Sequence, residues 1–147
     1  MEQSTKILFE DILLNGKFCT LATASLNGKP EAATIHYCVD KDYNIYFNSF
    51  PHYRKYQNIR SNPQASIVIT QNLNTIQMDG DVTELTGSST KFAKQLLLKK
   101  FPEDAKYLSD STGLFFKFNP AWIRILVDNG VLFEHVMIMD KSSGNIA

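Results

Sequence analysis

The chain has 147 residues, and its fifteen basic and fifteen acidic side chains leave it neutral. This length predicts a single domain over residues 1–147 that is large enough to bury a hydrophobic core. No apolar run reaches the ~20 residues of a membrane-spanning helix, and no signal peptide precedes the first expected helix. The chain also lacks the excess of basic charge that is typical of proteins that bind nucleic acids. We therefore expect a cytoplasmic protein with neither a membrane nor a nucleic acid as its partner.

The two cysteines, Cys19 and Cys38, are too few for a disulfide framework and are not spaced as metal ligands. Both fall in expected strands, which favours small buried hydrophobic residues over reactive thiols. No metal site is predicted.

The first part of the chain predicts one helix and three strands. Apolar residues recur with helical spacing over residues 4–15, where Ser4 or Thr5 is the expected cap and Gly16 the expected stop. Strands follow at residues 18–24, 31–39 and 45–49. Asn27-Gly28 is the expected hairpin turn between the first two, because both residues tolerate positive φ.

The second part predicts strands at residues 65–70, 75–85, 113–118, 122–127 and 131–139, with a helix at residues 88–100. Gly80 indicates a bulge or bend in the second of these strands. The pattern as a whole predicts a mainly β protein, an antiparallel barrel with flanking helices. Residues 1–16 form its N-terminal helix, residues 17–139 its barrel and residues 140–147 a disordered tail.

A short helix is expected between the third and fourth strands. Ser49 is its expected cap, Pro51 suits its first turn, and Asn62-Pro63 ends it. From residue 43 to residue 78 there is no acidic side chain, whereas Arg54 and Lys55 lie near the helix start.

Free helix N–H groups, the Ser49 hydroxyl and two cationic side chains at one strand end together suit a phosphate group. A solvated basic helix on the surface is an equally good reading of the charge alone.

The stretch GKFCTLATASLNGKPEAATIHYCVDKDYNIYFNSFPHYRKYQNIRSNPQASIVI contains an ATxxxxGxP hairpin and an aromatic strand that ends in a hydroxyl residue. An Arg-Lys pair and an Asn-Pro before the next strand follow. In this order and spacing the sequence resembles the pyridoxamine 5'-phosphate oxidase-like proteins, the FMN-binding split barrels. The resemblance is clearest over residues 16–85, and the GDVTEL strand followed by an amphipathic helix also fits it.

The resemblance implies a homodimer with FMN at the subunit interface. Ser49, Arg54 and Lys55 would hold the FMN phosphate, and the strand at residues 33–38 would run beside the flavin ring. The other positions that would contact the cofactor are Thr34, Ile35, His36, Asn48, Tyr53 and Thr75. FAD, a deazaflavin and haem are the alternative cofactors.

The substrate side departs from the vitamin oxidase. Where that enzyme grips a substrate phosphate with a strand lysine and with polar and cationic helix residues, this chain has Cys38, Ala93, Leu97 and Phe101. A phosphorylated substrate would lose charge-assisted contacts worth roughly 1.5–3 kcal/mol each. Oxidation of pyridoxamine phosphate is therefore not expected.

Three functions stay open. The first is a flavin-dependent oxidoreductase for a small electron acceptor, such as a nitro-aromatic compound or a quinone, with NAD(P)H as a possible electron donor. The second is a haem-binding or haem-degrading protein, for which His36, His52 and His135 are the candidate ligands. The third is a non-catalytic flavin-binding stress protein. His36 is the candidate catalytic residue, with an ordinary strand histidine as the alternative reading.

Overall fold

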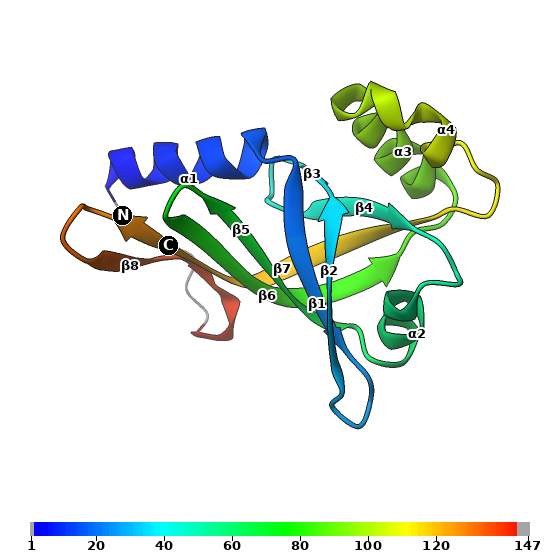
Figure 1. The fold of residues 1–147 in the computed structure, drawn as a ribbon, viewed down its shortest axis with the longest axis horizontal. Coiled ribbons are helices and arrows are strands. Elements are labelled where there is room, and N and C mark those ends of the chain that lie inside the picture. Colours follow the sequence, from blue (N-terminus) through cyan, green and yellow to red (C-terminus); the bar gives the residue numbers. More distant parts are fainter. Residues whose placement is uncertain (1, 144–147) are drawn as a thin grey trace.

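The computed structural model of the protein describes residues 2–143. One antiparallel sheet contains the strands β1 (Phe18–Ala24), β2 (Pro30–His36), β3 (Cys38–Val39), β4 (Ile45–Ser49), β5 (Gln64–Gln71), β6 (Asn74–Glu84), β7 (Leu114–Asp128) and β8 (Phe133–Asp140). The helices are α1 (Gln3–Asn15), α2 (Arg54–Ser61), α3 (Ser88–Lys100) and α4 (Ala105–Leu108), with 3-10 turns η1 (Pro102–Asp104) and η2 (Lys141–Ser143). The predicted split barrel with flanking helices is confirmed (Figure 1).

The sheet closes through one segment of chain. Its strand order is β2-β1-β5-β6-β7-β4-β3, and β8 pairs with β7 off this path. Only Tyr37 separates β2 from β3, so the two ends of the strand order are consecutive in sequence. His36 pairs with Phe18 of β1, whereas Cys38 pairs with Tyr46 of β4. One extended run therefore forms both edge strands of the sheet, and each of them pairs with a single neighbouring strand.

The barrel core is aromatic and aliphatic. Phe47 of β4 and Phe116 of β7 are fully buried and stack with ring centroids 5.2 Å apart. Helix α1 lies over one end of the barrel (Figure 1) and buries Phe9, Ile12 and Leu13 in the same core. Their spacing of three and four residues places them on one face of the helix, as the sequence predicted.

Strand β7 differs from the prediction of two separate strands at residues 113–118 and 122–127. It is one strand of fifteen residues, because its halves have different partners: β4 pairs with its start and β8 with its end. Pro120 lies opposite Gly80, where the register with β6 shifts. The bulge predicted at Gly80 is thus confirmed, and a Cβ at Gly80 would run into the Asn119 carbonyl.

The predictions for the two ends of the chain are only partly correct. The N-cap of α1 is Glu2, not Ser4 or Thr5, and no side chain caps it. The predicted tail begins with structure: Asp140 ends β8, and its Oδ1 accepts a hydrogen bond from the Ser142 backbone N–H at 3.1 Å. The rest of that tail, residues 144–147, lies outside the described residues. Within residues 2–143 no helix has the length and apolar character to cross a membrane.

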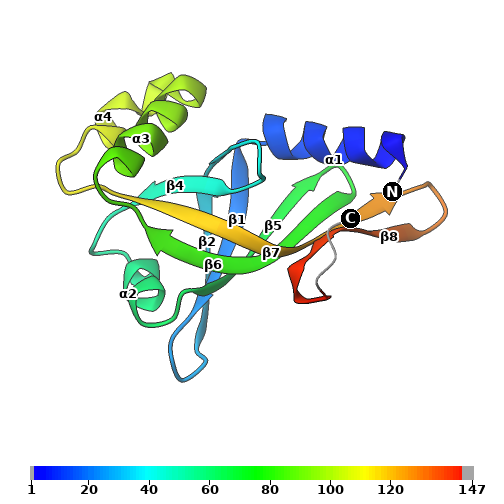
Figure 2. The same ribbon diagram turned by 180° about the vertical axis from the view of Figure 1, so that it is seen from behind.

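Helix α3 has the predicted bounds, but the sequence predicted no element over residues 101–112. There the chain forms η1 and α4, which pack beside α3 against β3 and β4 in a second apolar cluster. The buried members of this cluster are Cys38, Tyr46, Ala93, Leu97, Phe101, Leu108 and Phe115. The α3–α4 pair therefore forms a wall beside the barrel, well separated from α1 (Figure 2).

Both cysteines are buried, as predicted, and burial raises the pKa of Cys19 and of Cys38 to about 12. Because only the thiolate is nucleophilic, neither thiol should react with a disulfide reagent at pH 8 in the folded protein. Both should react in urea, where burial and its effect on the pKa are lost. Release of the reagent's chromophore measures this, and rapid labelling of the native protein would contradict it.

Candidate functional site

Two adjoining hollows lie beside the barrel: the larger is between the start of α2 and the α3–α4 pair, and the smaller is between β1, β2 and the start of α2. The larger has a volume of about 670 Å³ and the smaller about 340 Å³. Tyr53 and Lys55, at the start of α2, line both hollows. In Figure 2 α2 and α4 lie on opposite sides of β4. A combined space of this size falls in the range of cofactor pockets.

The larger hollow gathers most of the site predicted from sequence. The predicted cofactor residues that line it are Thr34, Ile35, His36, Asn48, Tyr53 and Lys55. They come from β2, β4 and the start of α2, which are adjacent because the segment 30–39 closes the barrel next to β4. The structure therefore brings together residues that are up to 21 positions apart in the sequence.

Two buried polar atoms at the end of β4 have no hydrogen-bond partner among the described residues. They are Nδ2 of Asn48 and Oγ of Ser49. A buried polar group without a partner costs about 1–3 kcal/mol, so such a pair is typical of a place where a polar ligand binds. Asn48 lines the larger hollow, and Ser49 lies next to it in the strand.

Ser49 does not cap α2, and this prediction was wrong. Ser49 is the last residue of β4, where it pairs with Leu114. A turn follows, in which the Tyr53 N–H donates to the Phe50 carbonyl at 3.1 Å, and α2 begins only at Arg54 with Tyr53 as its N-cap. No side chain caps this helix, so the N–H groups of its first turn lack a side-chain acceptor.

Lys55 is half-buried where the two hollows meet, and burial lowers its pKa. Its Nζ lies 4.4 Å from the centre of the Tyr53 ring. An anion beside Lys55 would offset the cost of burying this charge. Lys55 is therefore well placed to bind a phosphate or another anion.

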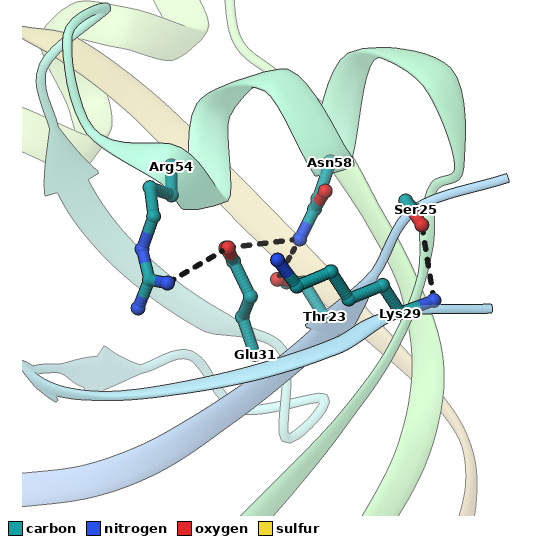
Figure 3. Close-up of polar contacts among 6 residues, drawn as sticks. All are labelled: Thr23, Ser25, Lys29, Glu31, Arg54 and Asn58. Carbon is teal, nitrogen blue, oxygen red and sulfur yellow. Dashed lines mark hydrogen bonds and ion pairs between the residues drawn. The ribbon is translucent and has the colours of Figure 1, made fainter. Parts of the chain in front are cut away.

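Arg54 does not line the larger hollow but pairs with a carboxylate. Its Nη1 lies 3.2 Å from Oε1 of Glu31 on β2, and 76% of its side chain is exposed (Figure 3). Glu31 is held from a second side, because Nδ2 of the buried Asn58 donates to Glu31 Oε2 and to Thr23 Oγ1, each at 3.1 Å. Glu31 is only 14% exposed, so a carboxylate borders the smaller hollow together with Arg54.

The acid-free stretch around α2 thus meets an acidic residue from another strand. Glu31 follows the β1–β2 hairpin turn, in which Gly28 has a φ of 88°. The Lys29 backbone N–H donates to the Ser25 hydroxyl across this turn (Figure 3). Sequence reasoning missed this contact, since only the strand pairing brings Glu31 to the helix start.

His36 is held in the wall of the larger hollow. Its Nδ1 lies 2.6 Å from Oδ2 of Asp104 in η1, and its ring stacks on Phe101 with centroids 4.4 Å apart and planes 3° apart. The ring of Phe18 lies 4.7 Å away on β1. Asp104 was not among the predicted site residues.

Tyr107 of α4 is a further residue that the sequence analysis missed. Its hydroxyl lies 3.2 Å from that of Tyr53, and it lines the larger hollow. Burial and this hydrogen bond raise the pKa of Tyr107. A signal did exist: Pro102 just after the end of α3, followed by Glu103 and Asp104, is typical of the first turn of a new helix.

The remaining candidates do not line the larger hollow. Thr75 is near the start of β6 and pairs with Thr70, so within one chain it does not line either hollow. His52 lines the smaller hollow. His135 lies on β8, exposed and paired with Leu126.

The positions that correspond to the substrate-phosphate site of the vitamin oxidase lie in apolar surroundings. Leu97 and Phe101 line the larger hollow, while Cys38 and Ala93 are buried in the cluster beneath α3. The hollow also carries three carboxylates, those of Glu103, Asp104 and Asp110, together with the cations of Lys55 and Lys106.

Fold and cleft together define a split-barrel protein with a cofactor-sized site beside the barrel. The chain belongs to the pyridoxamine 5'-phosphate oxidase family, whose sequence model matches residues 7–126. No curated protein matches the sequence.

Three solved structures illustrate the shared fold. ChuZ from Campylobacter jejuni is similar with a TM-score of 0.82 and 13% identity, over 100% of this chain and 63% of ChuZ. A haem-binding protein from Mycobacterium smegmatis has a TM-score of 0.70 and 17% identity, over 83% of this chain and 53% of that protein. General Stress Protein 26 from Bacillus anthracis has a TM-score of 0.68 and 17% identity, over 92% and 99%. The chain thus spans less than two thirds of the first two proteins.

Proposed function

We propose that the protein binds FMN in the two hollows and transfers electrons from the flavin to a small organic acceptor such as a quinone or a nitro-aromatic compound. The observation that carries the proposal is the gathering of most of the predicted cofactor residues around one cleft, among them Asn48, whose buried Nδ2 has no hydrogen-bond partner among the described residues. Membership of the pyridoxamine 5'-phosphate oxidase family supports it.

The residues present fit the cofactor in most respects. Lys55, Arg54 and the uncapped start of α2 would hold the phosphate, and Asn48, whose buried Nδ2 has no partner among the described residues, would hydrogen-bond a polar part of the flavin. The bound flavin supplies the hydride and electron chemistry, and the chain has to bind and orient it and to limit access of water. The apolar and acidic wall of Leu97, Phe101 and Asp104 favours a neutral or cationic acceptor over a phosphorylated one.

A titration with FMN tests the proposal. We expect quenching of flavin fluorescence with one FMN per chain, and bleaching of the bound flavin by dithionite followed by recovery with 1,4-benzoquinone. A homodimer with flavin at the interface is part of the proposal, and sedimentation of the FMN-loaded protein tests it. Absence of any FMN binding would refute the proposed function.

Haem is the second candidate. Asp104 holds Nδ1 of His36, and a histidine that ligates a metal through Nε2 is commonly oriented by such a carboxylate. The similar fold of the Mycobacterium smegmatis haem-binding protein supports this alternative. Addition of haemin tests it: a Soret band that is lost in His36→Gln would favour haem over FMN.

Glu31→Gln is expected to increase FMN affinity. The substitution removes the carboxylate that pairs with Arg54 at 3.2 Å, so Arg54 becomes free for the phosphate and a negative charge leaves the smaller hollow. An increase of about tenfold corresponds to roughly 1.4 kcal/mol. Fluorescence titration measures it, with Glu84→Gln at the end of β6 as the matched control. A weaker FMN complex would mean that Glu31 itself supports the bound state.

A further inference from the structure

His36 and Asp104 form a pair that the sequence gives no reason to expect. Their side chains are 36% and 26% exposed, they lie 68 residues apart, and Nδ1 and Oδ2 are separated by 2.6 Å. A carboxylate can only accept a hydrogen bond, so the proton of this contact is on Nδ1 of the imidazole. Nε2 is then the nitrogen that remains for a ligand.

The imidazole is also fixed by its neighbours. Phe101, which is 1% exposed, covers one face in a parallel stack at 4.4 Å, and Phe18 lies beside the ring at 4.7 Å. The ring therefore has one hydrogen-bonded edge and at least one covered face, and it borders the larger hollow. A histidine that served only as a surface residue would need none of these contacts.

We propose that His36 delivers a proton to the acceptor bound in the larger hollow and that Asp104 is the residue that positions it. The inference rests on the proposed function. A bound reduced flavin would supply the hydride, and the quinone that accepts it would gain negative charge on one oxygen. As this charge develops, the Nε2–H bond of the His36 imidazolium breaks and an O–H bond forms on the same oxygen, and neutral His36 then regains its proton from solvent. Asp104 stabilises the imidazolium before the transfer and keeps Nδ1 protonated after it.

Other ionisable groups line the same hollow and also affect how the reaction rate depends on pH. They are Tyr53, Lys55, Glu103, Lys106, Tyr107 and Asp110. The role of His36 is therefore read from the difference between variant and unchanged protein at each pH, rather than from a single profile.

The first test needs no flavin. Nitrogen-15 NMR of the ring nitrogens reports the tautomer, and the chain has only three histidines, so His52→Gln and His135→Gln identify the His36 signals. We expect neutral His36 to carry its proton on Nδ1, and Asp104→Ala to remove this preference. Asp42→Asn, in the turn before β4, is the control and should leave the signals unchanged. A neutral His36 protonated on Nε2 would overturn the proposal.

The second test measures the proton transfer. The FMN-loaded protein is reduced with dithionite and mixed with 1,4-benzoquinone in a stopped-flow instrument. His36→Gln should slow flavin reoxidation about 100-fold and Asp104→Asn should slow it less, as expected for loss of an acid catalyst and of its positioning partner. Equal rates in unchanged protein and His36→Gln would overturn the inference while the proposed function stands, whereas failure of the unchanged protein to bind FMN would remove the proposed function and this role of His36 with it. A Soret band of added haemin that depends on His36 would also overturn it, because Nε2 would then be a metal ligand.

Discussion

Replacing Arg54 and Lys55 together by alanine is expected to weaken FMN binding by at least about 100-fold, since charge-assisted hydrogen bonds contribute roughly 1.5–3 kcal/mol each. Lys55 is half-buried where the two hollows meet, so its loss removes the cation nearest to both. Loss of Arg54 adds to the effect, because Glu31 then remains near the phosphate without its counter-charge. Fluorescence titration of the double variant against unchanged protein measures the loss.

The two single variants separate the contributions of Arg54 and Lys55 to FMN affinity. Lys55→Ala should be the more severe, because Arg54 is 76% exposed and already paired with Glu31. Arg60→Ala, at the other end of the same helix, serves as a control for the overall charge of α2. An unchanged FMN affinity in the double variant would show that the phosphate is held elsewhere.

Phe116→Ala is expected to lower the free energy of unfolding by about 3–5 kcal/mol, the usual cost of deleting a buried aromatic ring. Phe116 is fully buried, stacks on Phe47 at 5.2 Å and contacts the Tyr56 ring of α2 at 6.2 Å. The cavity would therefore loosen both the barrel and the helix that carries Arg54 and Lys55. Urea unfolding followed by fluorescence measures the change.

Leu26→Ala is the matched control for this experiment. Leu26 lies in the β1–β2 turn and is 77% exposed, so its truncation should change the unfolding free energy by no more than about 0.5 kcal/mol. A similar loss in both variants would mean that the stack of Phe47 and Phe116 contributes little. A weakened FMN complex in Phe116→Ala at temperatures where the variant is folded would reveal the coupling of the core to α2.

Features that depend on neighbours along the chain could be predicted from sequence. The periodicity of α3, the bounds of β1, the bulge at Gly80 and the burial of Cys19 and Cys38 follow from local spacing and residue type. The family resemblance added the cofactor positions, and most of these line one cleft. The prediction that Ser49 caps α2 failed because of a contact between distant residues. The backbone of Ser49 pairs with Leu114 in the sheet and cannot also start a helix.

The charges of the site were decided by the tertiary structure alone. Arg54 was expected to hold the FMN phosphate, yet it pairs with Glu31, 23 positions earlier, because the β1–β2 hairpin packs against α2. Asp104 meets His36 only because η1 and α4 pack against β3 and β4. Local periodicity determines which face of a helix or strand is apolar, whereas the pairing of distant strands determines which ionised groups share a low-dielectric hollow. The strand pattern therefore predicted the barrel, and the family resemblance predicted most residues of its cleft. The packing of distant segments determined which charged side chains lie together in that cleft.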